Sequence, residues 1–262
     1  MNIIKFIESF TNEGLAQNKT SRRESLGQFG NLGKNLALAS IPFGLSALTG
    51  SAYAADITPT PATPVGALQL ALTLEYLEKE YYNLGLASGV IPTGGRDEKV
   101  FMQIAAHEND HVDFLIAGLG TNVVSKPTFD FTAGGLFNPF NDYQQFLALA
   151  QAFEDTGVRA YKGQAGNLIS TPDLLTAALQ IHSVEARHAS EVRRLRGEKG
   201  WIVGNSRGSL PSQAQGTYDG EENTTQAGYN TTTLFGVNPG TEAFDEPLTT
   251  EQVVTIANLF IV

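Results

Sequence analysis

Hydrophobic residues recur at alternating intervals of three and four along four stretches of the chain. This interval is that of one face of an α-helix, so the pattern predicts helices at about 64–88, 97–119, 141–167 and 172–197. Near the centre of each stretch, acidic or imidazole side chains stand on the apolar face where aliphatic residues are expected. Burying such groups costs several kcal/mol unless something compensates them, and a metal ion is the compensating group that we expect.

The links between these helices predict how they are arranged. Gly94 and its neighbours form a turn after the first helix, and a long connection at 120–141 contains prolines and several phenylalanines. The fourth helix follows the third closely, with a Thr171 cap before a first-turn Pro172. A short link, a long link and a short link indicate an all-α, four-helix bundle with one long crossover.

The domain organisation follows from composition. We expect a leader at 1–54, a Thr/Pro linker at 55–64 and the bundle at 65–199. The remaining segment, 200–262, is rich in Gly, Asn, Thr and Ser, which is too polar for a core of its own. We expect this segment to wrap the bundle or to stay mobile, and its last helix, at 249–260, to dock on the bundle.

The first 54 residues resemble a twin-arginine export signal. Ser21-Arg22-Arg23 precedes a mildly apolar run at 36–48 and a small-x-small site at 52–54. Ser25 and Gly27 depart from the usual motif, which leaves an ordinary amphipathic N-terminus as the alternative. The resemblance implies an exported protein, periplasmic or extracellular. The apolar run is too short to span a bilayer, so no membrane span is expected in the mature form.

Charge and the absence of cysteine restrict the chemistry. Lys and Arg number 17 against 27 Asp and Glu, and five of the bases but only three of the acids fall in residues 1–54, which leaves 12 bases and 24 acids. Such an acidic protein is a poor partner for nucleic acid or an anionic membrane and attracts cations. With no cysteine, carboxylate and imidazole are the strong ligands that the chain can offer a metal.

An internal repeat assigns the candidate ligands. The first and third helices match in register as Leu68, Ala71, Glu75, Glu78, Tyr82 against Leu147, Ala150, Glu154, Gly157, Tyr161. The second and fourth match as Phe101, Ile104, Glu108, His111, Leu115 against Ala178, Ile181, Glu185, His188, Val192. The chain therefore consists of two similar helical hairpins, each of which brings one Glu and one Glu-x-x-His to a shared centre.

This arrangement resembles the ferritin-like superfamily of di-iron and di-manganese carboxylate proteins. The resemblance covers about residues 64–199. It implies that Glu108 and Glu185 bridge two metal ions, and that the full ligand set is Glu75, Glu108, His111, Glu154, Glu185 and His188. The sequences of residues 74–82 and 243–249, together with the leader, resemble those of the exported ferritin-like group often labelled desiccation-related. This resemblance implies a role in stress responses.

One departure affects what the resemblance implies. Glu78 faces the centre where the third helix has Gly157, so an additional carboxylate is available and cage-forming iron storage does not follow. Oxygen and imidazole ligands together suit iron, manganese or zinc, with iron expected first. The resulting hypothesis is a dinuclear oxidase, ferroxidase or peroxide-consuming protein that meets oxygen or peroxide and can form homo-oligomers. The alternative is a non-enzymatic metal-binding or stress-protective bundle.

Another interpretation comes from His107-Glu108-x-x-His111, which spells the zinc metalloprotease motif with Glu108 as the base. It leaves Glu154 and the second Glu-x-x-His without a role. His107 then becomes at most a helper beside a dinuclear site.

Three further side chains border the centre. His182 is expected either behind the ligands or as a core histidine. Tyr82 and Tyr161 are expected as core phenols that each donate one hydrogen bond, although a phenol beside a redox metal can also relay an electron.

Overall fold

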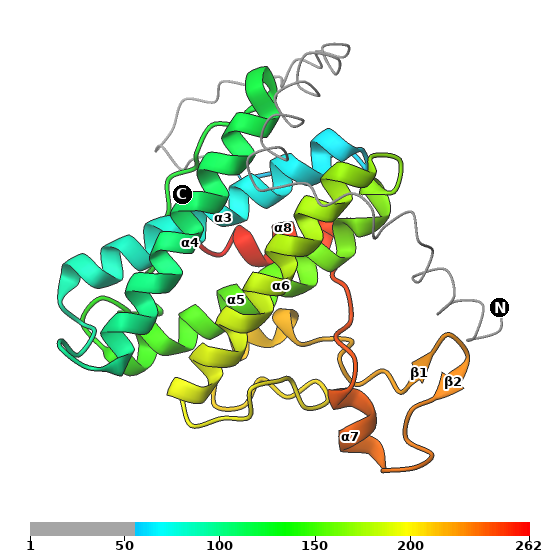
Figure 1. The fold of residues 1–262 in the computed structure, drawn as a ribbon. Coiled ribbons are helices and arrows are strands. Elements are labelled where there is room, and N and C mark those ends of the chain that lie inside the picture. Colours follow the sequence, from blue (N-terminus) through cyan, green and yellow to red (C-terminus); the bar gives the residue numbers. More distant parts are fainter. Residues whose placement is uncertain (1–55) are drawn as a thin grey trace.

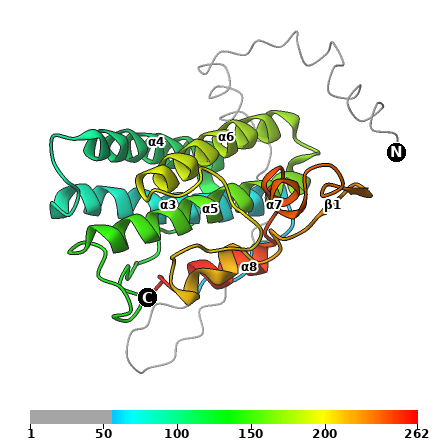
Figure 2. The same ribbon diagram turned by 90° about the horizontal axis from the view of Figure 1, so that it is seen from below.

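A computed structural model describes residues 56–262, and the leader predicted at 1–54 lies outside the described residues. Four long helices form the body of the molecule (Figure 1), namely α3 (Pro64–Ser88), α4 (Arg96–Leu119), α5 (Tyr143–Leu168) and α6 (Pro172–Leu195). Helix α3 packs mainly on α4, and α5 packs mainly on α6. The two hairpins lie against each other as a bundle (Figure 2), so the predicted all-α, four-helix architecture with one long crossover is confirmed.

The helix ends follow local chemistry. Thr63 caps α3 by accepting a hydrogen bond from the Gly66 backbone, Pro64 occupies its first turn, and Gly89 ends it in a left-handed conformation at φ 76°. At α6 the predicted cap is wrong in one respect. Thr171 stands at the N-cap but makes no capping hydrogen bond, because its hydroxyl donates to the Leu168 carbonyl instead.

Apolar layers fill the bundle on both sides of its midpoint. One layer contains Tyr82, Phe101, Ile104, Phe146, Leu147 and Val192. The other contains Leu68, Ala71, Val112, Leu115, Leu174, Ala178 and Ile181. Both layers are made by the periodic positions of the sequence pattern, and they leave the polar side chains between them out of contact with solvent.

The crossover from 120 to 142 is irregular apart from a short 3-10 helix, η1 (Gly120–Asn122). Its aromatic residues pack inward, and Phe131 and Phe137 belong to the buried core. The C-terminus pairs with it, since the Asp130 backbone N–H donates to the Phe260 carbonyl at 2.8 Å. The end of the chain therefore holds the crossover in place.

The segment after α6 contains small elements that the sequence pattern did not predict. They are η2 (Ser212–Thr217), the two-stranded antiparallel sheet of β1 (Thr225–Gln226) and β2 (Tyr229–Asn230), and α7 (Val237–Glu242). Helix α8 (Thr250–Ala257) follows, shorter than the helix expected at 249–260, and carries a capping box formed by Thr249 and Gln252. In the described residues, η2 and α8 both pack against α5.

A buried arginine on α5 holds this wrapped segment. Arg159, which is 1% exposed, forms an ion pair with Glu221 at 2.7 Å. It also donates to the backbone carbonyls of Thr217, Asp219 and Glu246. Because a buried guanidinium has to satisfy all its donors, these contacts require the segment to lie on α5.

A second buried ion pair ties the same segment to α5 and α6. Arg193 of α6 donates to both carboxylate oxygens of Asp155, and the Tyr218 hydroxyl donates to Asp155 Oδ2 at 2.7 Å. Farther along, a Cβ on Gly163 would lie 1.9 Å from the Leu248 carbonyl oxygen, so only glycine permits this approach of backbone to helix.

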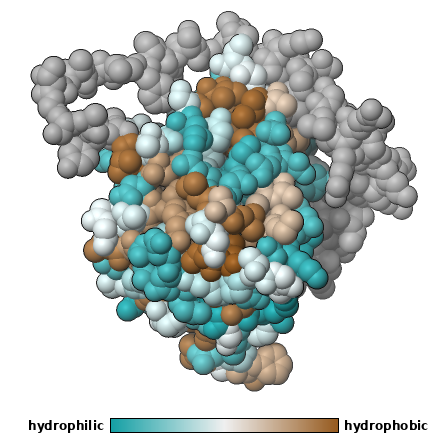
Figure 3. Space-filling model, turned by 90° about the vertical axis from the view of Figure 1, so that its left-hand side faces the viewer, coloured by the Kyte–Doolittle hydropathy of each residue, from teal (hydrophilic) through white to brown (hydrophobic). Residues whose placement is uncertain are grey.

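The surface mixes polar and apolar residues, as Figure 3 shows for one face. The most exposed large apolar side chains of the described residues are Leu234 and Phe235, next to α7, at 71% and 76%. None of the described helices combines the length and apolar character needed to span a membrane.

Candidate metal centre

The polar centre lies between the apolar layers, at the middle of the four long helices. Each helix contributes by the predicted pattern, α3 and α5 with one Glu each and α4 and α6 with one Glu-x-x-His each. The six side chains are Glu75, Glu108, His111, Glu154, Glu185 and His188. All four glutamates are 0% exposed. Residues three apart on a helix share a face, which is why each Glu and His of a pair point the same way.

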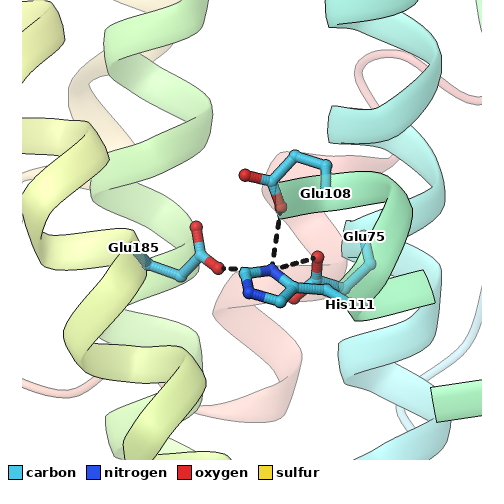
Figure 4. Close-up of side chains that lie close together, drawn as sticks. All are labelled: Glu75, Glu108, His111 and Glu185. Carbon is cyan, nitrogen blue, oxygen red and sulfur yellow. Dashed lines mark hydrogen bonds and ion pairs between the residues drawn. The ribbon is translucent and has the colours of Figure 1, made fainter. Parts of the chain in front are cut away.

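One group of side chains surrounds His111 (Figure 4). Its Nδ1 lies 3.2 Å from Oε2 of Glu75, 3.1 Å from Oε2 of Glu108 and 3.0 Å from Oε1 of Glu185. These carboxylates come from α3, α4 and α6, so three helices meet at this imidazole.

A second group surrounds His188 in the same way. Its Nδ1 lies 2.9 Å from Oε1 of Glu108, 3.4 Å from Oε2 of Glu154 and 3.3 Å from Oε2 of Glu185. Within each group the candidate ligand atoms all lie within 4.8 Å of one another. Glu108 and Glu185 belong to both groups and use a different oxygen in each, which is the arrangement of two bridging carboxylates.

Two tyrosines orient the carboxylates that belong to only one group. The Tyr82 hydroxyl donates to Oε1 of Glu154 at 2.5 Å, and the Tyr161 hydroxyl donates to Oε1 of Glu75 at 2.5 Å. Burial raises the pKa of both phenols, which keeps them as donors. The second carboxylate oxygen of Glu75 faces His111, and that of Glu154 faces His188. The two halves of the internal repeat therefore have the same arrangement in the structure.

Hydrogen bonds satisfy only part of the centre, where His111 Nδ1 bonds with Glu75 Oε2 and Glu108 Oε2. Five buried atoms have no hydrogen-bond partner in the described chain, namely Glu108 Oε1, Glu154 Oε2, Glu185 Oε1, Glu185 Oε2 and His188 Nδ1. They converge within a few ångströms but lack the directions that hydrogen bonds require. Buried polar atoms are normally satisfied. A cation in the second group would meet four of these atoms and a cation in the first group would meet Glu185 Oε1, so the residues fit a metal pair.

Protons and charge at this centre are strongly coupled. Burial opposes the protonation of His111 and His188, but the surrounding carboxylates outweigh it and raise the pKa of both imidazoles. Burial raises the pKa of Glu154 to about 7. Burial acts in the same direction on Glu185, but the two adjacent imidazoles, His111 and His188, lower its pKa overall. In the absence of metal, protons therefore carry the compensating positive charge.

Glu78 lies beside the six residues and is in neither ligand group. It is 2% exposed. A Cβ on Gly157 would stand 3.1 Å from its Oε1, so the glycine leaves the space that this carboxyl group needs. Burial, followed by the charge of Glu154, raises the pKa of Glu78 well above its usual value.

His107 lies outside the ligand groups but contacts one of them. Its Nδ1 is 2.9 Å from His188 Nε2, and its Nε2 is 2.7 Å from Gln103 Nε2. The sequence analysis did not single out Gln103. The available signal was its spacing of four residues from His107 on the same helix face.

His182 stands apart from both groups. Burial lowers its pKa, and the charge of Lys162 lowers it further. It contacts the Val158 backbone and is half-buried, and its Nδ1 has no hydrogen-bond partner among the described residues.

The comparison with protein families agrees with the fold. The sequence profile of the ferritin-like domain matches residues 63–198, which is more than half of the chain. The chain belongs to the ferritin-like domain family. The match begins just before α3 and ends just after α6, so the family domain coincides with the bundle and its polar centre. The comparison with curated proteins gives no match.

Proposed function

We propose that this ferritin-like protein binds two metal ions, iron first among them, and uses them to reduce a small oxidant such as oxygen or peroxide. The observation that carries the proposal is the pair of overlapping ligand groups that share Glu108 and Glu185. Two carboxylates shared in this way suit a metal pair roughly 3.5 to 4 Å apart. Two iron ions held there would supply electrons one from each ion, as the reduction of oxygen to peroxide requires.

The residues of the chain have separate roles in this proposal. Glu75 and His111 hold one ion, Glu154 and His188 hold the other, and the bridging glutamates neutralise charge on both. The apolar layers on either side exclude bulk water. The Tyr82 and Tyr161 hydroxyls orient Glu154 and Glu75 by hydrogen bonds and do not themselves bind the ions.

The metalloprotease alternative requires His107 and His111 on one ion. In the described part of the chain His107 is in neither ligand group, and its Nδ1 faces an imidazole nitrogen instead. The geometry therefore favours His107 as a supporting residue over a ligand.

We also propose that the protein is exported and acts outside the cytoplasm. The support is the sequence of the leader alone. Loading metal before a folded protein is exported would fit the twin-arginine route.

Oxygen uptake tests the proposed chemistry. Protein stripped of metal is reconstituted with ferrous iron without oxygen and then mixed with oxygenated buffer, while oxygen consumption and ferric absorbance are followed. We expect rapid uptake by the wild type, little by Glu185→Ala, and wild-type uptake by Asp113→Ala, which removes a 77%-exposed carboxylate of α4. Stable binding of iron without oxygen or peroxide consumption would instead support the non-enzymatic metal-binding alternative.

A further inference from the structure

The internal repeat predicts two equivalent metal positions. Each position receives one terminal Glu, one His and one phenol hydrogen bond, and both bridging glutamates serve both. Any inequality between the positions must therefore come from residues around the ligands. Two such differences are present, and the one that distinguishes the positions, at His107, lies on the side of Glu154 and His188.

The first difference is the support behind the imidazoles. His107, which precedes Glu108, packs against His188 with ring centroids 5.1 Å apart and planes at 12°. The repeat places Val184 at the equivalent position before Glu185, and valine has no hydrogen-bonding side chain. The outer nitrogen of His111 accordingly makes no hydrogen bond with any described residue, whereas that of His188 has His107 at 2.9 Å.

This support acts on the ligand nitrogen through the ring. When His188 binds a cation through Nδ1, its Nε2 must carry the proton and donate it to Nδ1 of His107. His107 then donates from Nε2 to the side-chain amide oxygen of Gln103. This requires the Gln103 amide to be flipped, so that its oxygen and nitrogen exchange places. Such outer contacts fix the tautomer and orientation of a ligand imidazole, and losing them typically lowers metal affinity about 10- to 100-fold.

The second difference is Glu78 opposite Gly157. A Cβ on Gly157 would lie 3.1 Å from Glu78 Oε1, so this additional carboxyl group stands between α3 and α5. Glu78 is 2% exposed, so it adds a buried acidic group to the centre. Its counterpart on the other side is absent because that position is glycine.

We propose that the two metal positions are unequal, and that the one formed by Glu154 and His188 fills first and more tightly. The proposal rests on the proposed dinuclear function and adds an order of loading to it. His107 is the positioning residue that creates the difference. The position of Glu75 and His111 then receives the second ion and releases it more readily.

A stepwise titration tests this order. Metal-free protein is titrated with Mn²⁺ without oxygen, and free Mn²⁺ is counted by its electron paramagnetic resonance signal. We expect two resolved steps, the first about 10- to 100-fold tighter than the second. His107→Leu should weaken the tight step by a similar factor and leave the weak one unchanged, whereas His107→Asn should restore part of it, because the asparagine oxygen can accept the His188 proton.

Two isosteric variants identify which position is tight. Glu75→Gln should keep the tight step and lose the weak one, and Glu154→Gln should lose the tight step. Two equal steps in the wild type, or loss of the tight step in Glu75→Gln, would overturn the order of loading and leave the dinuclear function intact. Binding of fewer than two ions by the wild type would contradict the proposed function itself, and the order of loading with it.

Discussion

The Tyr82 hydroxyl of α3 donates to Oε1 of Glu154 on α5 at 2.5 Å, so each hairpin orients a carboxylate of the other. The remaining oxygen of Glu154, Oε2, faces His188 at 3.4 Å. This relationship connects packing between the hairpins with the geometry of the candidate metal centre, because separating α3 from α5 would also release a ligand.

Removing this hydroxyl tests the connection. Tyr82→Phe keeps the packed ring but removes the donor to Glu154, and we expect metal affinity to fall about tenfold or more. Stability of the metal-free protein should fall by about 1–3 kcal/mol, since the buried acceptor loses its partner. Denaturant unfolding and metal titration measure both effects. Tyr143→Phe, which removes a hydroxyl bound to Asp97 away from the centre, should leave metal affinity unchanged; an equal loss in both variants would contradict a specific role for Tyr82.

The two candidate glutamates of α3 are separated by a pair of conservative changes. Glu75→Gln should lower total metal occupancy more than Glu78→Gln, because Glu75 belongs to a ligand group and matches Glu154 in the repeat, whereas Glu78 belongs to neither group. Elemental analysis after equilibration with excess iron and desalting gives the comparison. The reverse order would mean that the register of the repeat assigns the wrong residue.

Metal binding should release protons. The raised pKa values of His111 and His188 mean that both imidazoles hold protons near neutral pH, yet a metal requires the Nδ1 lone pair. Lower pH adds competing protons, including on Glu154, whose pKa is about 7. The apparent Kd should therefore rise about tenfold or more for each pH unit as the pH falls. Titrations at several pH values measure this slope. An affinity independent of pH would contradict the protonation of His111, His188 and Glu154 in the metal-free protein.

The leader allows a prediction that does not depend on the bundle. Replacing Arg22 and Arg23 by Lys keeps the charge but removes the guanidinium groups, so precursor should accumulate in the cytoplasm if the twin-arginine interpretation is correct. Cell fractionation and immunoblotting detect the precursor. Replacing Lys5 by Arg serves as the matched control, and normal export of the double-lysine variant would exclude this route.

The bundle and the convergence of six polar side chains could be predicted from the sequence because both depend on local periodicity. A helix face is determined by spacing alone, so Glu108 with His111 and Glu185 with His188 had to point inward together. That these residues bind metal stays a prediction. The export of the protein also stays a prediction, because its signal lies outside the described residues.

Other features could not be read from spacing. Arg159 and Asp155 look like ordinary polar helix residues, and their burial depends on the segment around Tyr218, which lies more than fifty residues away in sequence. The support of His188 by His107 likewise requires two helices from different hairpins to be placed side by side. Contacts of this kind come from tertiary packing, which a periodic pattern does not contain.

Metal stoichiometry tests the central claim most directly. Protein reconstituted with saturating iron or manganese and then desalted is measured by elemental analysis. We predict about two ions per chain for the wild type and for His107→Ala, which loses affinity but no ligand, and one or none for Glu185→Ala and His188→Ala. One zinc ion per chain, lost in His107→Ala and unaffected by Glu185→Ala, would contradict the dinuclear centre.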